Sequence, residues 1–339
     1  MICKFCHLKP TDFEMINMRN TLVVVALFLM ACSTADSEGV AEPTPESSLW
    51  SVDESFIKEG APFAFIDAPE FAAVGAVDKV ADEERVLLVK HNETLKAYPY
   101  VYLNYSEVVN DAIDGFNYIV SYCPQTKSGI CFTNKINGAP QPVLASGYLF
   151  KDNLVLTDRE NKSYWSQMLL KGIRGGQKEL PIQTTYSIET IWKTVKNYFP
   201  EAKVYIHDKL QTKGARTASN GSNHFGVVLE GLEERIELYR HQSFDKLRIR
   251  ETTVGGKNVV VLGDREKQLF TAFYVQPGAV FTLRSDFPNV MLGTDGTVYN
   301  VFGEAVEGLK KGQQLASPRC YNAELWAWQW FFEQTAIAF

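Results

Sequence analysis

The run Arg85–Lys90, which reads RVLLVK, decides how this chain is interpreted. It is short, apolar and rich in branched side chains, and Tyr118–Cys123 and Val259–Leu262 have the same character. Runs of this kind predict β-strands. Because they do not alternate regularly with long helical segments, a doubly wound parallel sheet is not expected. The sequence therefore predicts an α+β fold that is rich in strands.

Parts of the sequence recur in its second half. Residues 172–177 (GIRGGQ) resemble residues 308–313 (GLKKGQ), and Tyr186 corresponds to Tyr321. We therefore predict two tandem related lobes. The first covers residues 80–223, including a polar linker, the second covers 224–339, and residues 49–79 form an N-terminal extension.

Each predicted lobe ends in an amphipathic helix with a polar N-cap, Ser187 in the first lobe and Asn322 in the second. The apolar positions at helical spacing are Ile188, Ile191, Trp192 and Val195 and, in the second lobe, Ala323, Trp326, Ala327 and Trp330. Large and small side chains exchange places between the two sets, which a well-packed core tolerates. We therefore expect these tryptophans to be core residues and not a platform for a ligand.

The beginning of the chain has the features of an export signal. Leu22–Met30 is an apolar run that follows Arg19 and is too short to span a bilayer. It leads directly into Ala31 and Cys32, a pattern that resembles the lipobox of bacterial lipoprotein signal peptides. We expect residues 1–31 to be a cleaved signal peptide, Cys32 to carry the lipid, and residues 32–48 to be a flexible tether.

Residues 1–17 precede the signal, and Met18 is the more natural start. The haem-attachment pattern C-x-x-C-H at Cys3–His7 lies in this segment and would be removed with it. We therefore expect neither haem nor another cofactor.

Localisation and partners follow from the anchor and the charge. A lipid on Cys32 would hold the protein on the bacterial cell envelope without crossing the membrane. By resemblance to the sorting of enterobacterial lipoproteins, Ser33 after the cysteine favours the outer over the inner membrane. The net charge of −6, with no basic stripe, argues against nucleic acid as a partner. The expected partners are the membrane and an unidentified envelope ligand or protein.

Several motifs occur in a characteristic order. They are residues 96–99 (KAYP), 103–111 (LNYSEVVND), 122–124 (YCP), 163–167 (SYWSQ) and 302–308 (FGEAVEG). Together they resemble an uncharacterised bacterial family known as domain of unknown function three-one-seven-nine. The resemblance covers most of the chain from Arg85 onward and implies no activity.

The chain departs from the family pattern at two places. Family members tend to have Asn-Trp-His-Glu where this chain has Asn104–Glu107, and Cys-Pro-Leu-Cys where it has Cys123–Thr126. A Cys-x-x-Cys pair with a nearby histidine would suit a soft metal or a redox reaction. Since the histidine and the second cysteine are replaced here, we predict no metal site.

Cys123, Cys131 and Cys320 remain after processing. The first two flank a polar turn between two strand-like runs. If these runs pair as a hairpin, the two sulfur atoms could face each other, and a disulfide would stabilise the fold by about 2–3 kcal/mol. The alternative is two unlinked thiols on separate faces, because spacing alone does not define the geometry.

Two groups of polar residues are candidates for a binding or catalytic cleft. The first group is Asn104, Glu107, Asn110 and Asp111, and the second is Ser146, Asp158, Arg159, Ser163, Trp165 and Gln167. In one interpretation both groups line one cleft, with Glu107 or Asp111 as acid or base and Arg159 binding an anion. In the other interpretation, which we favour, they are turn residues, caps and a surface ion pair.

The leading hypothesis for function is a membrane-anchored envelope lipoprotein that acts as a non-catalytic binding or assembly module. One alternative is a periplasmic redox or metal-handling protein that uses Cys123 with Cys131. Another is an enzyme of unrecognised type that uses Glu107 or Asp111. Whether the protein is an enzyme stays open, although the absence of a known catalytic motif favours the binding module.

Overall fold

The computed structural model describes residues 49–133, 135–136, 139–160, 162–210, 213, 223–228, 236–332 and 335–338. The predicted signal peptide, Cys32 and the tether lie outside the described residues, as does most of the predicted linker. Ser48–Phe339 form one compact unit. Among the described residues, no helix is both long enough and apolar enough to cross a membrane.

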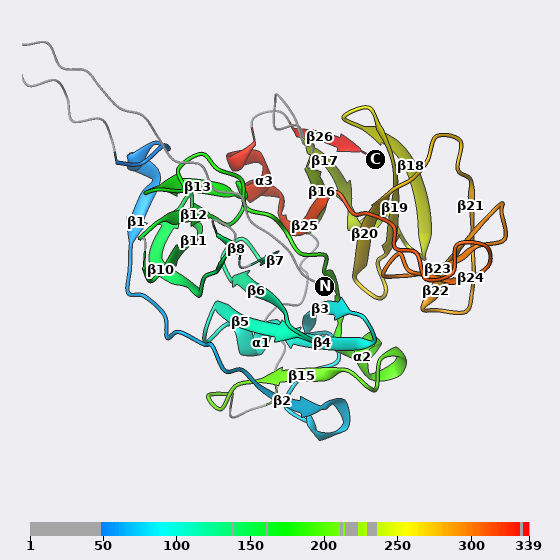
Figure 1. The fold of residues 1–339 in the computed structure, drawn as a ribbon, viewed down its shortest axis with the longest axis horizontal. Coiled ribbons are helices and arrows are strands. Elements are labelled where there is room, and N and C mark those ends of the chain that lie inside the picture. Colours follow the sequence, from blue (N-terminus) through cyan, green and yellow to red (C-terminus); the bar gives the residue numbers. More distant parts are fainter. Residues whose placement is uncertain are drawn as a thin grey trace, which may run out of the picture. The chain divides into compact units, whose positions relative to one another are not determined.

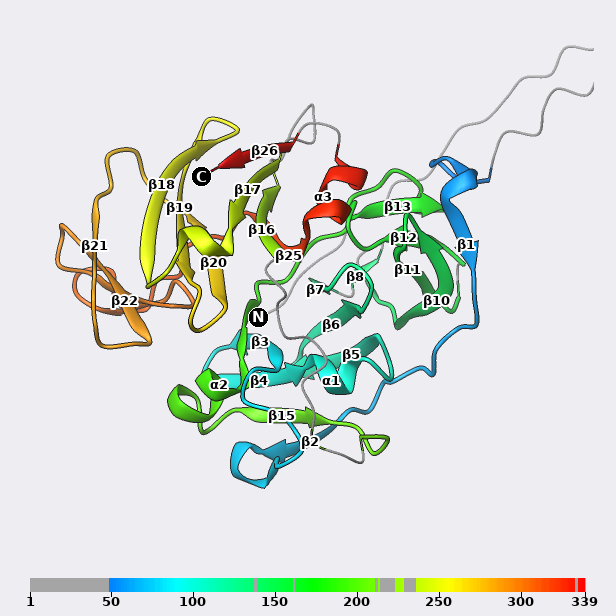
Figure 2. The same cartoon turned by 180° about the vertical axis from the view of Figure 1, so that it is seen from behind.

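Strands dominate the fold, as predicted. The described residues contain three short α-helices, α1 (Tyr100–Leu103), α2 (Trp192–Tyr198) and α3 (Leu325–Phe331), and three 3-10 turns, η1 (Glu54–Phe56), η2 (Val74–Ala76) and η3 (His241–Ser243). All other regular elements are strands, which Figures 1 and 2 show from opposite sides.

The largest sheet has eight strands and draws on both predicted lobes. Its order is β18 (Arg248–Val254), β19 (Lys257–Asp264), β20 (Leu269–Tyr274), β14 (Ile188–Ile191), β3 (Arg85–His91), β4 (Thr94–Pro99), β15 (Lys203–Ile206) and β2 (Glu70–Ala73). Strand β14 joins the strands of the two predicted lobes, because it pairs with β3 of the first lobe on one side and with β20 of the second lobe on the other. The predicted boundary at residue 223 therefore separates strands of one sheet, and two separate lobes are not confirmed.

The other sheets are smaller. One contains β25 (Arg319–Glu324), β16 (Asn223–Val228), β17 (Ile236–Arg240) and β26 (Thr335–Ala338), and another contains β5 (Val108–Ile113), β6 (Phe116–Cys123) and β7 (Ser128–Thr133). A five-stranded sheet contains β1 (Ile57–Glu59), β10 (Val143–Phe150), β11 (Asn153–Asp158), β12 (Tyr164–Ser166) and β13 (Lys171–Arg174). The last two contain β21 (Phe281–Leu283), β22 (Asn289–Gly293), β23 (Val298–Asn300) and β24 (Ala305–Glu307), and β8 (Lys135–Ile136) with β9 (Ala139–Pro140).

The order of strand pairing recurs along the chain. In the first set, β14 pairs antiparallel with β3, β3 pairs antiparallel with β4, and β4 pairs parallel with β15. The second set repeats this order with β25, β16, β17 and β26. The run β5–β6–β7 corresponds to β18–β19–β20, and the run from β10 to β13 corresponds to the run from β21 to β24. Tyr186 donates to the carbonyl of Val301 (3.2 Å), and Tyr321 donates to that of Met168 (2.7 Å). Tyr186 thus bonds the turn before β24, and Tyr321 bonds the turn before β13, the corresponding strand.

The two predicted helices begin later than expected. Ile188–Ile191 forms β14, and α2 starts only at Trp192; Arg319–Glu324 forms β25, and α3 starts at Leu325. Strand β14 has neighbours on both edges, and its residues are buried on both faces of the sheet except at its end. Such a strand loses the alternation of apolar and polar residues, so its apolar positions can match a helical spacing.

The later start of α3 changes which tryptophans are buried. Trp192 lies in the core as predicted, but Trp326 is 41% exposed and Trp330 is only partly buried. Trp328, which lies outside the predicted apolar face, is fully buried instead. The expectation that Trp326 belongs to the core is therefore wrong, because the helix presents a different face to the protein.

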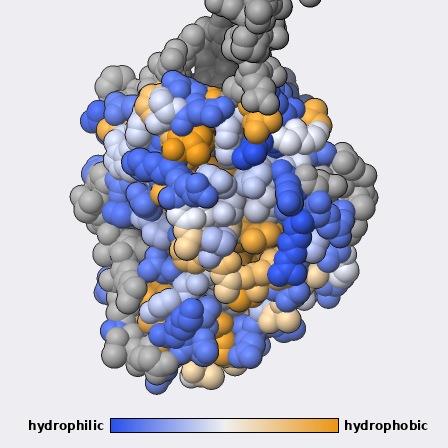
Figure 3. Space-filling model, turned by 90° about the vertical axis from the view of Figure 1, so that its left-hand side faces the viewer, coloured by the Kyte–Doolittle hydropathy of each residue, from blue (hydrophilic) through white to orange (hydrophobic). Residues whose placement is uncertain are grey.

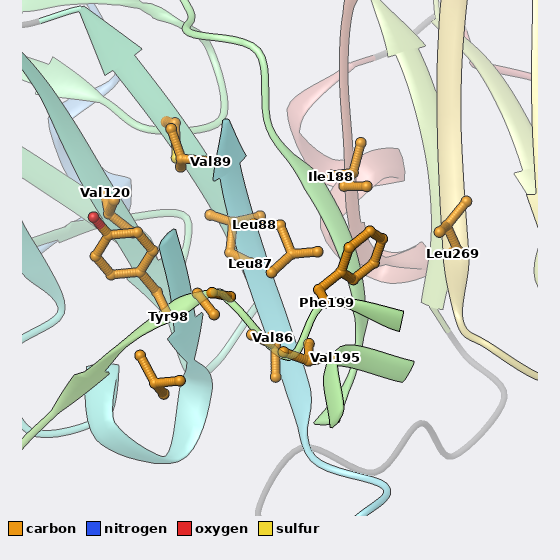
Figure 4. Packing of buried hydrophobic residues seen from close by; sticks show 14 of the residues in the cluster. Val86, Leu87, Leu88, Val89, Tyr98, Val120, Ile188, Val195, Phe199 and Leu269 are labelled. Carbon is orange, nitrogen blue, oxygen red and sulfur yellow. The ribbon is translucent and has the colours of Figure 1, made fainter. Parts of the chain in front are cut away.

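Strand β3 is central to the main hydrophobic cluster. Figure 4 shows Val86, Leu87, Leu88 and Val89 among apolar side chains contributed by other elements. The labelled neighbours are Tyr98 of β4, Val120 of β6, Ile188 of β14, Val195 of α2, Phe199 directly after α2, and Leu269 of β20. The RVLLVK run is thus an interior strand, which explains its nearly continuous apolar character.

A buried ion pair accompanies this strand. Arg85 and Glu189 are 1% and 4% exposed, and Arg85 Nε donates to Glu189 Oε1 at 2.6 Å. The carboxylate also accepts hydrogen bonds from Tyr100 Oη (2.5 Å) and Asn322 Nδ2 (3.2 Å). Strands β3, β14 and β25 and helix α1 therefore meet at one carboxylate.

We expect Arg85→Met to lower the free energy of unfolding by about 3–5 kcal/mol, because it leaves the Glu189 carboxylate buried without its cation. The double variant Arg85→Met with Glu189→Leu should recover much of this loss. Urea unfolding followed by tryptophan fluorescence measures both changes. Lys58→Met removes an exposed ion pair with Asp152 and should cost at most about 1 kcal/mol. Equal effects at Arg85 and Lys58 would contradict a special role for the buried pair.

Candidate functional site

The side chains of the first group of predicted site residues have different surroundings. Asp111 accepts two hydrogen bonds from Lys96 Nζ (2.9 and 2.7 Å) and one each from Tyr98 and Tyr118. The Lys96 ammonium in turn lies 4.3 Å from the centre of the Phe71 ring. All these groups hold Asp111 in place, so it has a structural environment and not that of an acid or base.

Asn110 and Ser146 also have structural roles. Asn110 Nδ2 donates to the carbonyls of Ile66 (3.1 Å) and Val143 (2.7 Å), and its Oδ1 accepts from the Val143 amide (2.8 Å). Ser146 donates to the carbonyl of Val155 (2.6 Å) where the pairing of β10 with β11 is irregular. These side chains fasten β5 and β11 to β10.

Glu107 differs from the rest of its group. Its backbone is in the left-handed region (φ 56°), and burial raises the pKa of its carboxyl from 4.5 to about 7. No hydrogen bond or ion pair to its carboxylate exists among the described residues. Asp111 is four residues further along an extended chain, about 13 Å away. Glu107 and Asp111 therefore do not form an acid–base pair, and Asn104 caps the end of α1 through its backbone N–H.

The second group is dispersed as well. The guanidinium of Arg159 stacks 3.7 Å from the centre of the Phe65 ring, and the buried Asp158 accepts a hydrogen bond from the Ser163 amide (3.2 Å). Gln167 is fully buried in a polar network, and Trp165 faces a pocket. Of the two interpretations, the one that places both groups around a shared cleft gains no support from these positions.

The network around Gln167 holds the turn that follows Cys123. Gln167 Oε1 accepts from Ser128 Oγ (2.7 Å) and Asn153 Nδ2 (2.8 Å), and Asn153 Nδ2 also donates to Thr126 Oγ1 (2.9 Å). The Cys123 thiol points to the Asp152 carbonyl at 3.7 Å. Thr126, which replaces the second cysteine of the family pattern, is therefore an integral part of a hydrogen-bond network.

Of the two alternatives for Cys123 and Cys131, the structure has the unlinked thiols and not the disulfide. Strands β6 and β7 do make the expected hairpin, but Cys131 pairs with Val120 and Cys123 pairs with Ser128. Val120 and Cys123 are three residues apart in one strand, so their side chains point to opposite faces. Cys123, Cys131 and Cys320 are all free, and the first two belong to different hydrophobic clusters.

The buried thiols are poor nucleophiles. Burial raises the pKa of the Cys123 thiol above its ordinary 9.0 and that of Cys131 to about 12. A thiolate is the reactive and metal-binding form of cysteine, so neither side chain is activated at neutral pH. In the part of the chain that the structure describes, no three His, Cys, Asp or Glu side chains come together as a metal site.

A mostly apolar pocket of about 330 Å³ lies beside Trp165. Its walls are Ile119, Phe132, Thr133, Lys135, Val143, Leu156, Trp165, Gln177, Leu180, Pro181, Ile182 and Gln183. Lys135 is exposed and is the single charged group of this wall. An aromatic and aliphatic wall with a few polar groups is the usual composition of a small-molecule site.

Sequence reasoning missed most of these residues. Leu180–Gln183 carries no motif, so nothing in the sequence places it beside Trp165. The buried pair Arg85–Glu189 left a weak signal, since Arg85 stands next to a strongly apolar run. A charged residue at the end of an interior strand is unusual enough to be noted.

Residues 60–224 match the model of the family described as Protein of unknown function (DUF3179), and this part of the chain belongs to that family. The matched range contains the whole Trp165 pocket and every candidate residue from Asn104 to Gln167. Comparison with curated proteins gave no match, and comparison with solved structures gave none either. The family description supplies no activity, so function has to be argued from the geometry.

We expect Glu107→Gln to remove part of the pH dependence of stability. Because the folded pKa of about 7 lies above the ordinary 4.5, the folded protein binds this proton more tightly than the unfolded chain. The wild type should then lose up to about 3 kcal/mol as the pH rises from about 4.5 to about 7.

Urea unfolding at several pH values across that window measures this loss. The glutamine variant should lack it, whereas Glu93→Gln, at an exposed turn position, should keep it. Parallel pH curves for the wild type and Glu107→Gln would show that the carboxyl is not perturbed by the fold.

Proposed function

We propose that this protein is a lipoprotein of the bacterial envelope, anchored through Cys32, whose folded part binds a small apolar ligand in the Trp165 pocket. The anchor is argued from the sequence: an apolar run, a small residue and a cysteine precede a polar, proline-containing stretch. The outer membrane is the favoured location, because Ser33 follows the cysteine.

The pocket is the observation that carries the binding role. Its volume of about 330 Å³ lies at the lower end of the range for small-molecule sites. Trp165 and Phe132 provide aromatic wall, and Lys135 and Gln183 provide polar groups that could orient a ligand. This composition favours a compact apolar molecule with one polar or anionic group.

The two alternatives have less support. A redox or metal-handling role for Cys123 needs an accessible thiolate, and this thiol is buried with a raised pKa. An enzymatic role is favoured by one observation, the partly buried Glu107 with a pKa of about 7, which is the range of a general base. In the described part of the chain no second catalytic group is identified beside it, so we rank this role below binding.

We also infer that the chain is a structural duplication of two related lobes. The recurring order of strand pairs supports this inference, as do the reciprocal hydrogen bonds of Tyr186 and Tyr321. The lobes share a sheet through β14, so they would act as one body and not as two independent binding domains.

Acylation of Cys32 tests the anchor. The full chain, expressed in a bacterial host, should incorporate labelled palmitate, co-sediment with membranes and begin at Cys32 by mass spectrometry. Cys32→Ser should abolish the label, and Cys6→Ser should not change it. An unmodified Cys32 with the preceding residues still attached would disprove the proposal.

Binding of the fluorescent probe 1-anilinonaphthalene-8-sulfonate tests the pocket. The native protein should bind it, and Leu180→Glu should weaken binding by about tenfold or more, since it places a carboxylate in an apolar wall and repels the sulfonate of the probe. Leu309→Glu is the matched control, because Leu309 is 86% exposed and lies outside the pocket. Unchanged binding by Leu180→Glu would exclude the pocket as the site.

A further inference from the structure

Three aromatic side chains form a surface cluster that the binding pocket does not use. The ring centres of Trp326 and Trp330 are 6.2 Å apart, and those of Trp330 and Phe56 are 5.7 Å apart. We call these three residues the aromatic patch. Lys151 completes it, because its Nζ donates to the Trp330 carbonyl (2.6 Å) and lies 5.5 Å from the Phe56 ring.

The patch is unusual for a water-exposed surface. Four of the six tryptophans are buried, whereas Trp326 is 41% exposed and Trp330 is partly buried. Figure 3 shows the face on the side of β1 and β10, where apolar residues are set among hydrophilic ones. A partly exposed tryptophan pair needs an environment that accepts both an apolar ring and an N–H group.

The position of the patch along the chain points to its partner. Phe56 follows Leu49, the first described residue, by seven positions, so at most about 25 Å of chain separates them. Leu49 itself is 66% exposed. The 17 residues from Cys32 to Leu49 can span at most about 60 Å. An anchor at Cys32 would therefore keep the patch within reach of the lipid surface.

We propose that the aromatic patch docks on the surface of the lipid bilayer and orients the anchored protein. Tryptophan is enriched at membrane interfaces, where its ring contacts acyl chains and its N–H faces the headgroups. Asp53 lies close enough to Lys151 for their charges to interact, so Lys151 is not an isolated positive charge beside the patch. This inference rests on the proposed lipid anchor for its location but not for its chemistry.

Fluorescence quenching by brominated lipid tests the contact. The full chain, purified from membranes in detergent, is reconstituted into phosphatidylcholine vesicles with brominated or ordinary acyl chains. Bromine should quench up to about a third of the emission, because two of the six tryptophans lie in the patch. The double variant Trp326→Phe with Trp330→Phe should lose nearly all of this quenching, and Trp192→Phe, which removes a buried ring, should keep it.

The outcomes separate this proposal from the anchor. Intact mass measured on the same sample reports whether Cys32 is acylated. An acylated protein without quenching would overturn the patch alone, and quenching that persists in the double variant would overturn it too. An unmodified Cys32 would overturn the anchor, while quenching lost in the double variant would still support the patch. Association of copies that Trp326→Glu abolishes, without any quenching, would assign the patch to a protein contact and refute the lipid proposal.

Discussion

The buried ion pair between Arg85 and Glu189 is the constraint on which the rest of the fold depends. Neither charge can be left alone at this depth without a cost of several kcal/mol. The pair fixes β3 against β14, and Tyr100 and Asn322 bring α1 and β25 to the same carboxylate. Asn223, with its amide oxygen turned toward Arg85, extends the network to Glu324.

This network lies where the two recurring sets of strands meet. Strand β14 pairs with β3 of the first set and with β20 of the second, and Glu189 is the residue that faces Phe270 of β20. Separating the sets would break a sheet and also expose an ion pair that is satisfied by both. The two recurring sets of strands are thus held together as one body.

The sequence predicts the strand-rich class well, because interior strands such as β3 carry runs of branched apolar residues that few other structures need. It fails at β14 and β25, where burial of a strand on both faces removes the period of two and lets a helical spacing fit by coincidence. For the candidate site, the sequence left two interpretations open. Asn110 and Asp111 are neighbours on β5, so their side chains point to opposite faces, which agrees with the favoured interpretation of structural roles better than with one shared cleft.

The turn from Cys123 to Thr126 explains how a chain can depart from its family pattern without losing the fold. Thr126 accepts a hydrogen bond from Asn153, and Ser128 and Gln167 complete the same network. A hydroxyl can join such a network more readily than a thiol, because it is the stronger donor and acceptor. The polar groups of this turn are thereby hydrogen-bonded to one another and not available to a ligand. The proposed ligand would instead contact the apolar wall beside Trp165.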